Sequence, residues 1–198
     1  MTIRVRDTVH IKNFSVAKKP PITFSDIFAI KFAHIGVKNW EEKKRAILKN
    51  MGEVVHDKVV GGEYLETNFA EYSKEGDKMN VTSILEEELS EFMIQTGGVV
   101  TVNGSWVERS INGMHHNIHN HGATGYSAAC YVCYDSNIHS PTQFVSPFNH
   151  PITGEVIHYQ PNVKEGDLIL FPSFIHHYTT PNQSDTERIV LSFNLKCY

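Results

Sequence analysis

The chain of 198 residues has a formal net charge of −4, with 18 lysines and arginines against 22 aspartates and glutamates. This balance does not indicate a nucleic acid or an anionic membrane as a partner, because both attract an excess of positive charge. Apolar residues make up 40% and charged residues 20%, as in an ordinary globular protein. The odd number of cysteines, three, excludes a complete disulfide framework, and no apolar run approaches the length of a bilayer span, so we expect a cytoplasmic protein.

Two helices are predicted in the first half of the chain. Residues 39–52 place Trp40 and a short apolar group among charged residues, and the segment ends at Gly52, a typical helix stop. Residues 81–98 show apolar residues at helical spacing, with Ser83 and Glu86 in the positions of a capping box. We expect both helices to serve in packing.

The second half of the chain predicts β-structure. From Gly98 onward, short apolar segments of strand length are separated by turn sequences, which favours a sandwich or a barrel. Residues 3–9 and 22–35 also resemble strands. We therefore expect a mainly β fold with flanking helices and one domain over residues 1–198. In it, residues 1–97 supply strands and supporting helices, and residues 98–198 form the β core with the site.

Histidines are concentrated in two places. The segment "HHNIHNH" covers residues 115–121, and "FPSFIHHYTTP" contains His176 and His177. Imidazole groups suit iron, copper, zinc and nickel, and three or more protein ligands are normally needed to hold such an ion. His119 and His121 are two residues apart, so in a strand they point to the same side. Either His176 or His177 can supply a distant third ligand.

The last predicted strand, "ERIVLSFN", begins with an arginine. Arg188, Val190, Ser192 and Asn194 share one face by the period of two. A lone arginine that faces a β core is an unpaired buried charge unless an anion binds there, and guanidinium groups bind carboxylates through two parallel hydrogen bonds. Ser192 can add a hydroxyl to this contact. A redox-capable metal beside a carboxylate-binding arginine is what an iron enzyme with a keto acid as co-substrate requires.

Three segments together resemble the 2-oxoglutarate- and Fe(II)-dependent oxygenases. They are "SWVERSINGMHHNIHNHGATGYSAACYVCYD", "VKEGDLILFPSFIHHYTTP" and "ERIVLSFN". The chain is most similar to a family of such oxygenases known mainly from sequences of bacteria and their phages. The resemblance covers roughly the C-terminal half and implies a double-stranded β-helix, a cupin-like jelly-roll whose mouth holds the iron.

The resemblance also implies roles for individual residues. His119 and His121 match the two histidines of the family's "HxH" phrase, and His177, rather than His176, matches the histidine that follows "FPS". Arg188 matches the arginine that holds the far carboxylate of 2-oxoglutarate. Tyr131 matches a tyrosine that bonds the same carboxylate in related prolyl hydroxylases. The expected catalytic and metal-binding set is therefore His119, His121 and His177, and the expected co-substrate set is Arg188, Tyr131 and Ser192.

One departure from the superfamily pattern leaves the ligand set open. The usual triad has an acid two residues after the first histidine, but here that position is His121. All three histidines can bind the iron, or His119 and His177 can bind it with water in the remaining place. In the third reading, His121 is the first ligand and Ala123 stands where the acid would be, a pattern similar to halogenases.

The resemblance implies a dioxygenase that converts 2-oxoglutarate to succinate and CO2 and hydroxylates a substrate, either a small molecule or a protein side chain. The protein would bind and orient the reactants and exclude side reactions. We expect residues 135–155 to form a loop at the mouth of the barrel. Two alternatives use the same residues: a three-histidine cupin-type metalloenzyme that needs no keto acid, and a non-catalytic metal-binding jelly-roll module. The sequence does not specify the oligomeric state.

Overall fold

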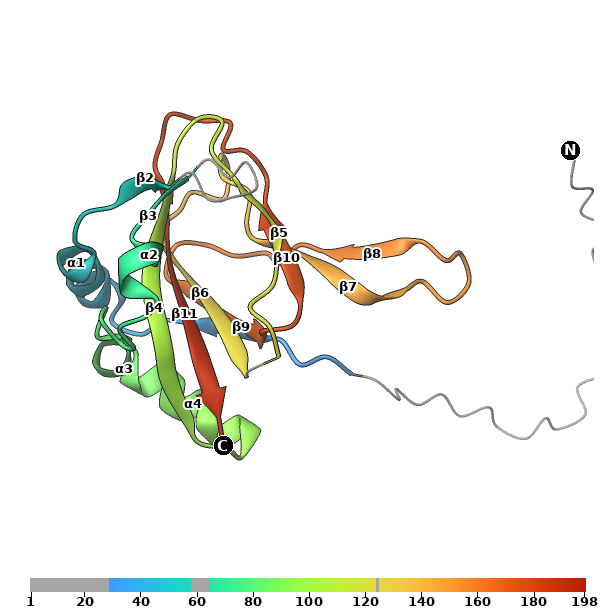
Figure 1. The fold of residues 1–198 in the computed structure, drawn as a ribbon, viewed down its shortest axis with the longest axis horizontal. Helices are drawn as coiled ribbons and strands as arrows, with labels where there is room; N and C mark the ends of the chain where they lie inside the picture. The colour runs from blue at the N-terminus through green and yellow to red at the C-terminus, as the bar shows by residue number, and fades with distance from the viewer. Residues whose placement is uncertain (1–28, 58–64, 124) are drawn as a thin grey trace, which may run out of the picture. The chain divides into compact units, whose positions relative to one another are not determined.

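The computed structural model describes residues 29–57, 65–123 and 125–198, which form antiparallel sheets with four helices (Figure 1). Residues Lys31–Tyr198 belong to one unit. The predicted strand at residues 3–9 lies outside the described residues, as does the first half of the segment 22–35, residues 22–28. The helices of the described chain are too short and too polar to cross a membrane.

Two sheets contain all the described strands. The large sheet has the order β1-β9-β6-β11-β4-β3-β2, and the small sheet has the order β5-β10-β7-β8. Every strand pair in the described chain is antiparallel. The strands of the large sheet are β1 (Ala33–Gly36), β2 (Val55–Asp57), β3 (Leu65–Thr67), β4 (Val100–Ser110), β6 (Tyr126–Cys133), β9 (Asp167–Pro172) and β11 (Arg188–Cys197). Those of the small sheet are β5 (His116–His119), β7 (Gln143–Asn149), β8 (Val156–Tyr159) and β10 (His176–Thr179).

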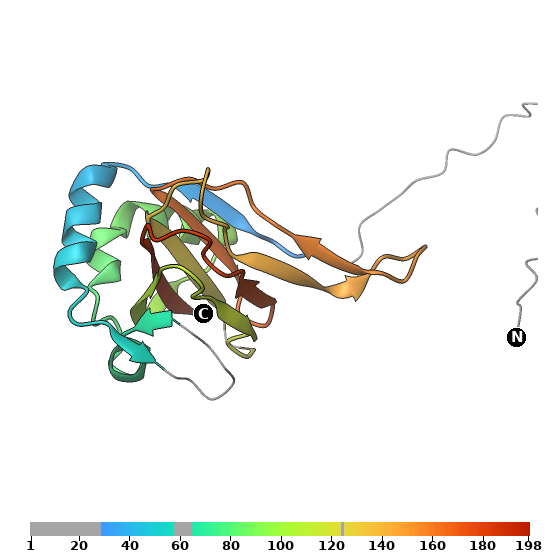
Figure 2. The same cartoon turned by 90° about the horizontal axis from the view of Figure 1, so that it is seen from above.

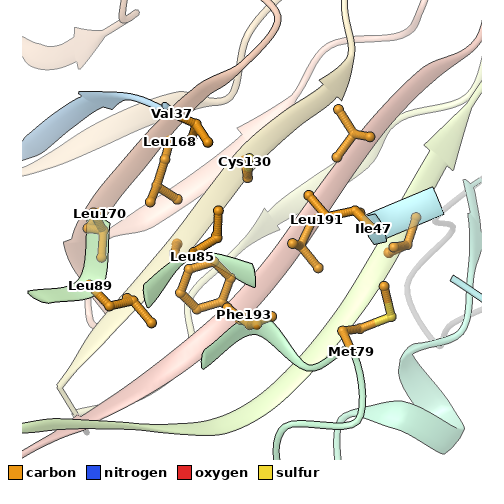
Figure 3. Packing of buried hydrophobic residues seen from close by; sticks show 14 of the residues in the cluster. Val37, Ile47, Met79, Leu85, Leu89, Cys130, Leu168, Leu170, Leu191 and Phe193 are labelled. Atoms are coloured by element: carbon orange, nitrogen blue, oxygen red, sulfur yellow. The ribbon is translucent and has the colours of Figure 1, made fainter. Parts of the chain in front are cut away.

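The helices cover one face of the large sheet, and the small sheet lies on the other side (Figures 1 and 2). They are α1 (Trp40–Asn50), α2 (Phe69–Tyr72), α3 (Val81–Ile84) and α4 (Glu86–Thr96). Apolar side chains of the sheet face meet apolar side chains of the helical layer (Figure 3). This core includes Val37, Ile47, Met79, Leu85, Leu89, Cys130, Leu168, Leu170, Leu191 and Phe193. The prediction of a β core with helices packed on one face is confirmed.

The opposite face of the large sheet forms a second core with the small sheet. Because side chains alternate along a strand, the neighbours of the residues in the first core point to this side. Ala129 and Tyr131 of β6 and Phe171 of β9 are buried there. Phe144 of β7 packs edge-to-face on Phe171, with 4.7 Å between the ring centroids. The site described below lies in this second layer.

The first predicted helix is confirmed as α1, but the second is interrupted. The chain leaves helical geometry at Leu85, where φ is −109° and ψ is 30°, and so forms α3 and α4 instead of one helix over residues 81–98. The predicted capping box of Ser83 and Glu86 is wrong. The carboxylate of Asp77 accepts hydrogen bonds from the backbone N–H groups of Val81 at 2.6 Å and Thr82 at 2.8 Å. The helical segment therefore begins before Ser83, which is too far along to act as its cap.

Residues 135–155, predicted as a loop, contain a strand. Residues Gln143–Asn149 form β7, which pairs with β10 and with the edge strand β8. The two strands β7 and β8 run together as a ribbon beyond the rest of the small sheet (Figure 1). Pro147 within this segment obscured the strand, since proline is depleted in central strands. Strand β7 supplies Phe144 to the second core.

Candidate metal and co-substrate site

Three histidines from two remote segments of the chain converge in the second layer. His119 is the last residue of β5 and lies directly opposite His177 of β10 in the strand register. His121 follows two residues beyond β5, and its backbone N–H donates to the carbonyl of Ser173 at 2.9 Å. Each ring offers one nitrogen such that the three nitrogens lie within 4.8 Å of one another. His177 is buried and His176 is exposed, so His177 is the histidine that joins the cluster.

All three imidazoles are held with the same nitrogen facing an oxygen. Nδ1 of His119 lies 2.8 Å from the carbonyl of Asn117, and Nδ1 of His177 lies 2.9 Å from the carbonyl of Ile175. Nδ1 of His121 lies 2.7 Å from the side-chain oxygen of Asn194. Because an oxygen of this kind only accepts, each Nδ1 carries the proton and donates it. This fixes the tautomer and leaves the lone pair of each Nε2 for a metal, as in known histidine-metal sites.

The environment keeps these rings neutral. Burial, with a contribution from the charge of His116, lowers the pKa of His119 to about 4. Burial likewise lowers the pKa of His121 and brings the pKa of His177 well below its ordinary value. Metal ligands must be deprotonated, so all three groups are in the binding form at neutral pH.

The donor set fits the iron that the resemblance implies. Three neutral imidazoles in one small volume suit a divalent first-row metal such as Fe(II). Of the three ligand sets that the sequence left open, this geometry favours the one with all three histidines. Ala123, which stands at the acid position in the halogenase-like reading, is exposed.

Arg188 lies in the same layer as a buried cation. Arg188 is 5% exposed, and its NH2 group donates a long hydrogen bond of 3.5 Å to Thr142 Oγ1. Among the described residues its Nε has no hydrogen-bond partner. The guanidinium stands 5.7 Å from the centroid of the Tyr131 ring. Such a group is expensive to bury alone, and an anionic ligand would satisfy it.

Tyr131 and Thr142 form the wall next to this arginine. Tyr131 is fully buried, and its hydroxyl oxygen accepts a hydrogen bond from the backbone N–H of Thr142 at 3.1 Å. Burial raises the pKa of Tyr131, so the phenol stays protonated and can donate. Sequence reasoning missed Thr142, since it lies just before β7 in the segment predicted as a loop. Its place beside Arg188 comes from tertiary packing.

Ser192 shares the face of Arg188, as predicted, but its hydroxyl contacts a carboxylate. Ser192 Oγ donates to Glu108 Oε1 at 3.3 Å, and Trp106 Nε1 donates to the same oxygen at 3.0 Å. The second oxygen, Oε2, lies 3.4 Å from Nδ1 of His116. Burial alone would raise the pKa of Glu108, but the charge of His116 and the hydrogen bonds from His116 and Trp106 lower it strongly. Glu108 is therefore an ionised carboxylate inside the protein.

Sequence reasoning also missed Glu108, Trp106 and His116. The ring of His116 stacks on that of His119 with 3.9 Å between the ring centroids. Glu108 and Trp106 share one face of β4 by the period of two, and strand β11 brings Val190 and Ser192 opposite them. The period of two in "SWVERS" already placed Trp106 and Glu108 on the same side of the strand.

Two cavities adjoin the histidines and diverge beyond them. The larger, of about 190 Å³, is bounded by apolar groups from β3, α2 and β4 together with Glu108, His116, His119 and His121. The apolar groups are Leu65, Phe69 and Trp106. The smaller, of about 20 Å³, has the same four polar residues and His177, and extends toward Thr142. A metal on the three histidines would thus adjoin a small cavity leading toward the wall of Arg188 and a larger one on the aromatic side.

The comparisons with known proteins agree with this arrangement. Residues 104–194 match the sequence family described as "Putative 2OG-Fe(II) oxygenase". No curated protein matches the chain. The matched region contains the histidines, the arginine, Tyr131 and Glu108.

Solved structures of 2-oxoglutarate enzymes share the fold. The epimerase SnoN from nogalamycin biosynthesis is 14% identical, with 83% of this chain and 76% of that chain covered and a TM-score of 0.62. HygX from Streptomyces hygroscopicus, solved with nickel, 2-oxoglutarate and hygromycin B, is 12% identical (83% and 82% covered, TM-score 0.59). A prolyl hydroxylase from Trichoplax adhaerens, in complex with a peptide fragment, is 12% identical (84% and 83% covered, TM-score 0.55).

The prediction of a jelly-roll of this class is confirmed by the fold, and the sequence resemblance is confirmed by the family match. The three-histidine cluster supplies a place where iron fits. Residues 104–194 thus match the family described as "Putative 2OG-Fe(II) oxygenase", and the chain shares its fold with solved 2-oxoglutarate enzymes.

Proposed function

We propose that the chain is a dioxygenase that uses Fe(II) and 2-oxoglutarate, hydroxylates a substrate, and releases succinate and CO2. The observation that carries the proposal is the pairing of two features in one buried layer. Three neutral imidazoles bring their metal-binding nitrogens within 4.8 Å of one another, and Arg188 lies buried without an acid within ion-pair distance among the described residues. The first feature is suited to a metal, and the second is suited to a carboxylate.

The proposed roles follow from these positions. His119, His121 and His177 would hold the iron, which when bound supplies the activation of oxygen. Arg188 receives the far carboxylate of 2-oxoglutarate through its free Nε–H and its NH2 group. The protonated hydroxyl of Tyr131 donates to the same carboxylate. Ser192, proposed as a further contact, lies at the edge of the smaller cavity next to Glu108.

The primary substrate would enter the larger cavity. Its volume of about 190 Å³ is smaller than the roughly 300–1,000 Å³ typical of pockets for drug-sized ligands, so it suits a side chain or one end of a larger molecule. Trp106 and Phe69 form an aromatic wall, with 4.9 Å between their ring centroids. Structures with this fold have been solved with an antibiotic and with a peptide fragment, so both small molecules and protein side chains are reasonable candidates.

Spectroscopy of the metal-free protein tests the proposal. Anaerobic addition of Fe(II) and 2-oxoglutarate should produce a weak visible charge-transfer band. In the Arg188→Ala variant, the charge-transfer band should appear only at much higher concentrations of 2-oxoglutarate. Arg45→Ala is the matched control, because Arg45 is exposed on α1 behind the large sheet and should leave the titration unchanged. A folded, iron-loaded wild-type protein without the band would contradict the proposal.

A second candidate is a three-histidine metalloenzyme that needs no keto acid. It is favoured by the ligand set itself, which has no carboxylate among the mutually close metal-binding atoms of the described residues. Arg188 would then bind a carboxylate of the substrate. Oxygen consumption without succinate formation would support this candidate, whereas stoichiometric succinate would exclude it. Tight zinc binding with no oxygen uptake would instead indicate the non-catalytic module.

We also propose that the protein acts in the cytoplasm. Its three cysteines are free: Cys130 is buried, Cys133 is half-buried and Cys197 is exposed. Free thiols together with an Fe(II) cofactor suit a reducing compartment, because an oxidising one favours disulfides. Fractionation of the native host cell would test this location.

A further inference from the structure

The three-histidine ligand set has an electrostatic consequence. The usual triad of this superfamily contains one carboxylate, whose negative charge partly neutralises the metal. The ligands here are three neutral imidazoles, so a divalent ion would keep its full double charge inside a buried site. An uncompensated charge is costly in such surroundings. A nearby fixed anion would therefore stabilise the bound metal.

Glu108 is a carboxylate in the right place for this task. Its side chain is 14% exposed, and it borders both cavities next to the histidine cluster. Hydrogen bonds from Trp106 and Ser192 fix its Oε1 atom. These donors come from β4 and β11, which are paired in the large sheet. The carboxylate is thus held rigidly and does not belong to the group of three ligands that can touch one ion.

His116 lies between Glu108 and the cluster. The Oε2 atom of Glu108 lies 3.4 Å from Nδ1 of His116, and the His116 ring stacks on His119. Glu108 lines both cavities together with His119 and His121, and the smaller cavity is also lined by His177. The negative potential of the Glu108 carboxylate therefore reaches the volume in which the metal would lie.

We propose that Glu108 is an outer carboxylate of the metal centre. It supplies, from beyond the ligands, the negative charge that the acid of the usual triad supplies by direct coordination. The proposal rests on the metal site of the proposed function. Glu108 is a positioning residue in this scheme, because its charge acts on the ion through space without touching it.

Nickel binding to the metal-free protein provides the first test. Glu108→Gln keeps the size of the side chain and an oxygen for Trp106 and Ser192, but removes the charge. We expect its affinity for Ni(II) to fall by about 10- to 100-fold, the range found when partners of metal ligands are removed. Glu187→Gln is the matched control, since Glu187 is an exposed acid paired with Arg109, and it should bind Ni(II) like the wild type. Equal affinity of Glu108→Gln and wild type would overturn the proposal.

A redox measurement distinguishes an electrostatic effect of the Glu108 carboxylate from a purely structural role of its side chain. A fixed negative charge favours Fe(III) over Fe(II), so Glu108→Gln should raise the Fe(III)/Fe(II) potential. A tenfold change in the ratio of the two affinities corresponds to about 59 mV for one electron. An unchanged potential would overturn the proposal, because a purely structural role predicts no preference between the two oxidation states.

His116→Phe provides a test that does not depend on the stability of the Glu108 variant. The phenyl ring preserves the stack on His119 and leaves the carboxylate charge in place. We expect Ni(II) affinity equal to that of the wild type, because the carboxylate charge still acts on the ion through space. A loss of tenfold or more would overturn the proposal, since the two residues would then act as one structural unit. A wild type that fails to bind Ni(II) would instead count against the proposed metal site itself.

Discussion

Replacement of Arg188 by methionine should stabilise the metal-free protein while it abolishes tight keto-acid binding. Arg188 is 5% exposed, its Nε has no partner among the described residues, and its contact with Thr142 is long, at 3.5 Å. A buried ion carries an effective penalty of several kcal/mol, and the contact with the Tyr131 ring offsets only about 0.5–2 kcal/mol of it. Methionine has a similar length and no charge. We therefore expect the free energy of unfolding to rise by about 1–3 kcal/mol.

The same change should remove about 2–5 kcal/mol from 2-oxoglutarate binding, which corresponds to roughly 30-fold or more in Kd. Thermal unfolding of the metal-free protein measures the first effect, and about 2–4 °C per kcal/mol is expected for a domain of this size. Arg109→Met is the control: Arg109 pairs with Glu66 and Glu187, so its loss should not stabilise the fold. A metal-free Arg188→Met protein with a lower Tm than the wild type would refute the reasoning, because Arg188 would then be part of the structural core.

Three further predictions concern pH, the ligand tautomer and the helical layer. His119 has a folded-state pKa of about 4 against 6.5 in the unfolded chain, so the unfolded chain binds the proton first as pH falls. The free energy of unfolding should drop by about 1.6 kcal/mol between pH 6.5 and 5, and urea titrations that show no drop would contradict this. Asn194→Leu removes the acceptor of His121 Nδ1–H and should weaken Ni(II) binding by about 10- to 100-fold in calorimetry, whereas unchanged binding would mean that the tautomer needs no support. Ile47→Ala, at a fully buried position between α1 and the sheet, should lower the free energy of unfolding by about 2–5 kcal/mol in urea titrations but leave the Ni(II) affinity of the folded protein unchanged.

The main parts of the site could be predicted because their signals are local. His119 and His121 are two residues apart, and the alternation in "RIVLSFN" placed Arg188 and Ser192 on one face, as the structure shows them. The choice of His177 over His176 came from the family phrase, and the burial of the two residues agrees with it. A period of two is sufficient to assign a face within one strand.

The parts that were missed depend on contacts between distant strands. Glu108 reaches the histidines because β4 pairs with β11 in a register that opposes Glu108 with Val190. Thr142 lies next to Arg188 only after β7 has joined the small sheet. Similarly, the apolar residues keep their helical spacing through Leu85, where the backbone leaves helical geometry. Sequence periodicity defines which side chains share a face, but the register between strands defines which of them meet.

The three histidines are held by different sheets, so a bound metal would also connect the two sheets. His119 and His177 are paired residues of the small sheet, whereas the ring of His121 is bonded to Asn194 of β11 in the large sheet. An ion shared by all three would act as a non-covalent cross-link between the layers. At a free concentration 100 times its Kd it would add about 2.7 kcal/mol to the folded state, and slower amide hydrogen exchange in β5, β10 and β11 would report this tightening.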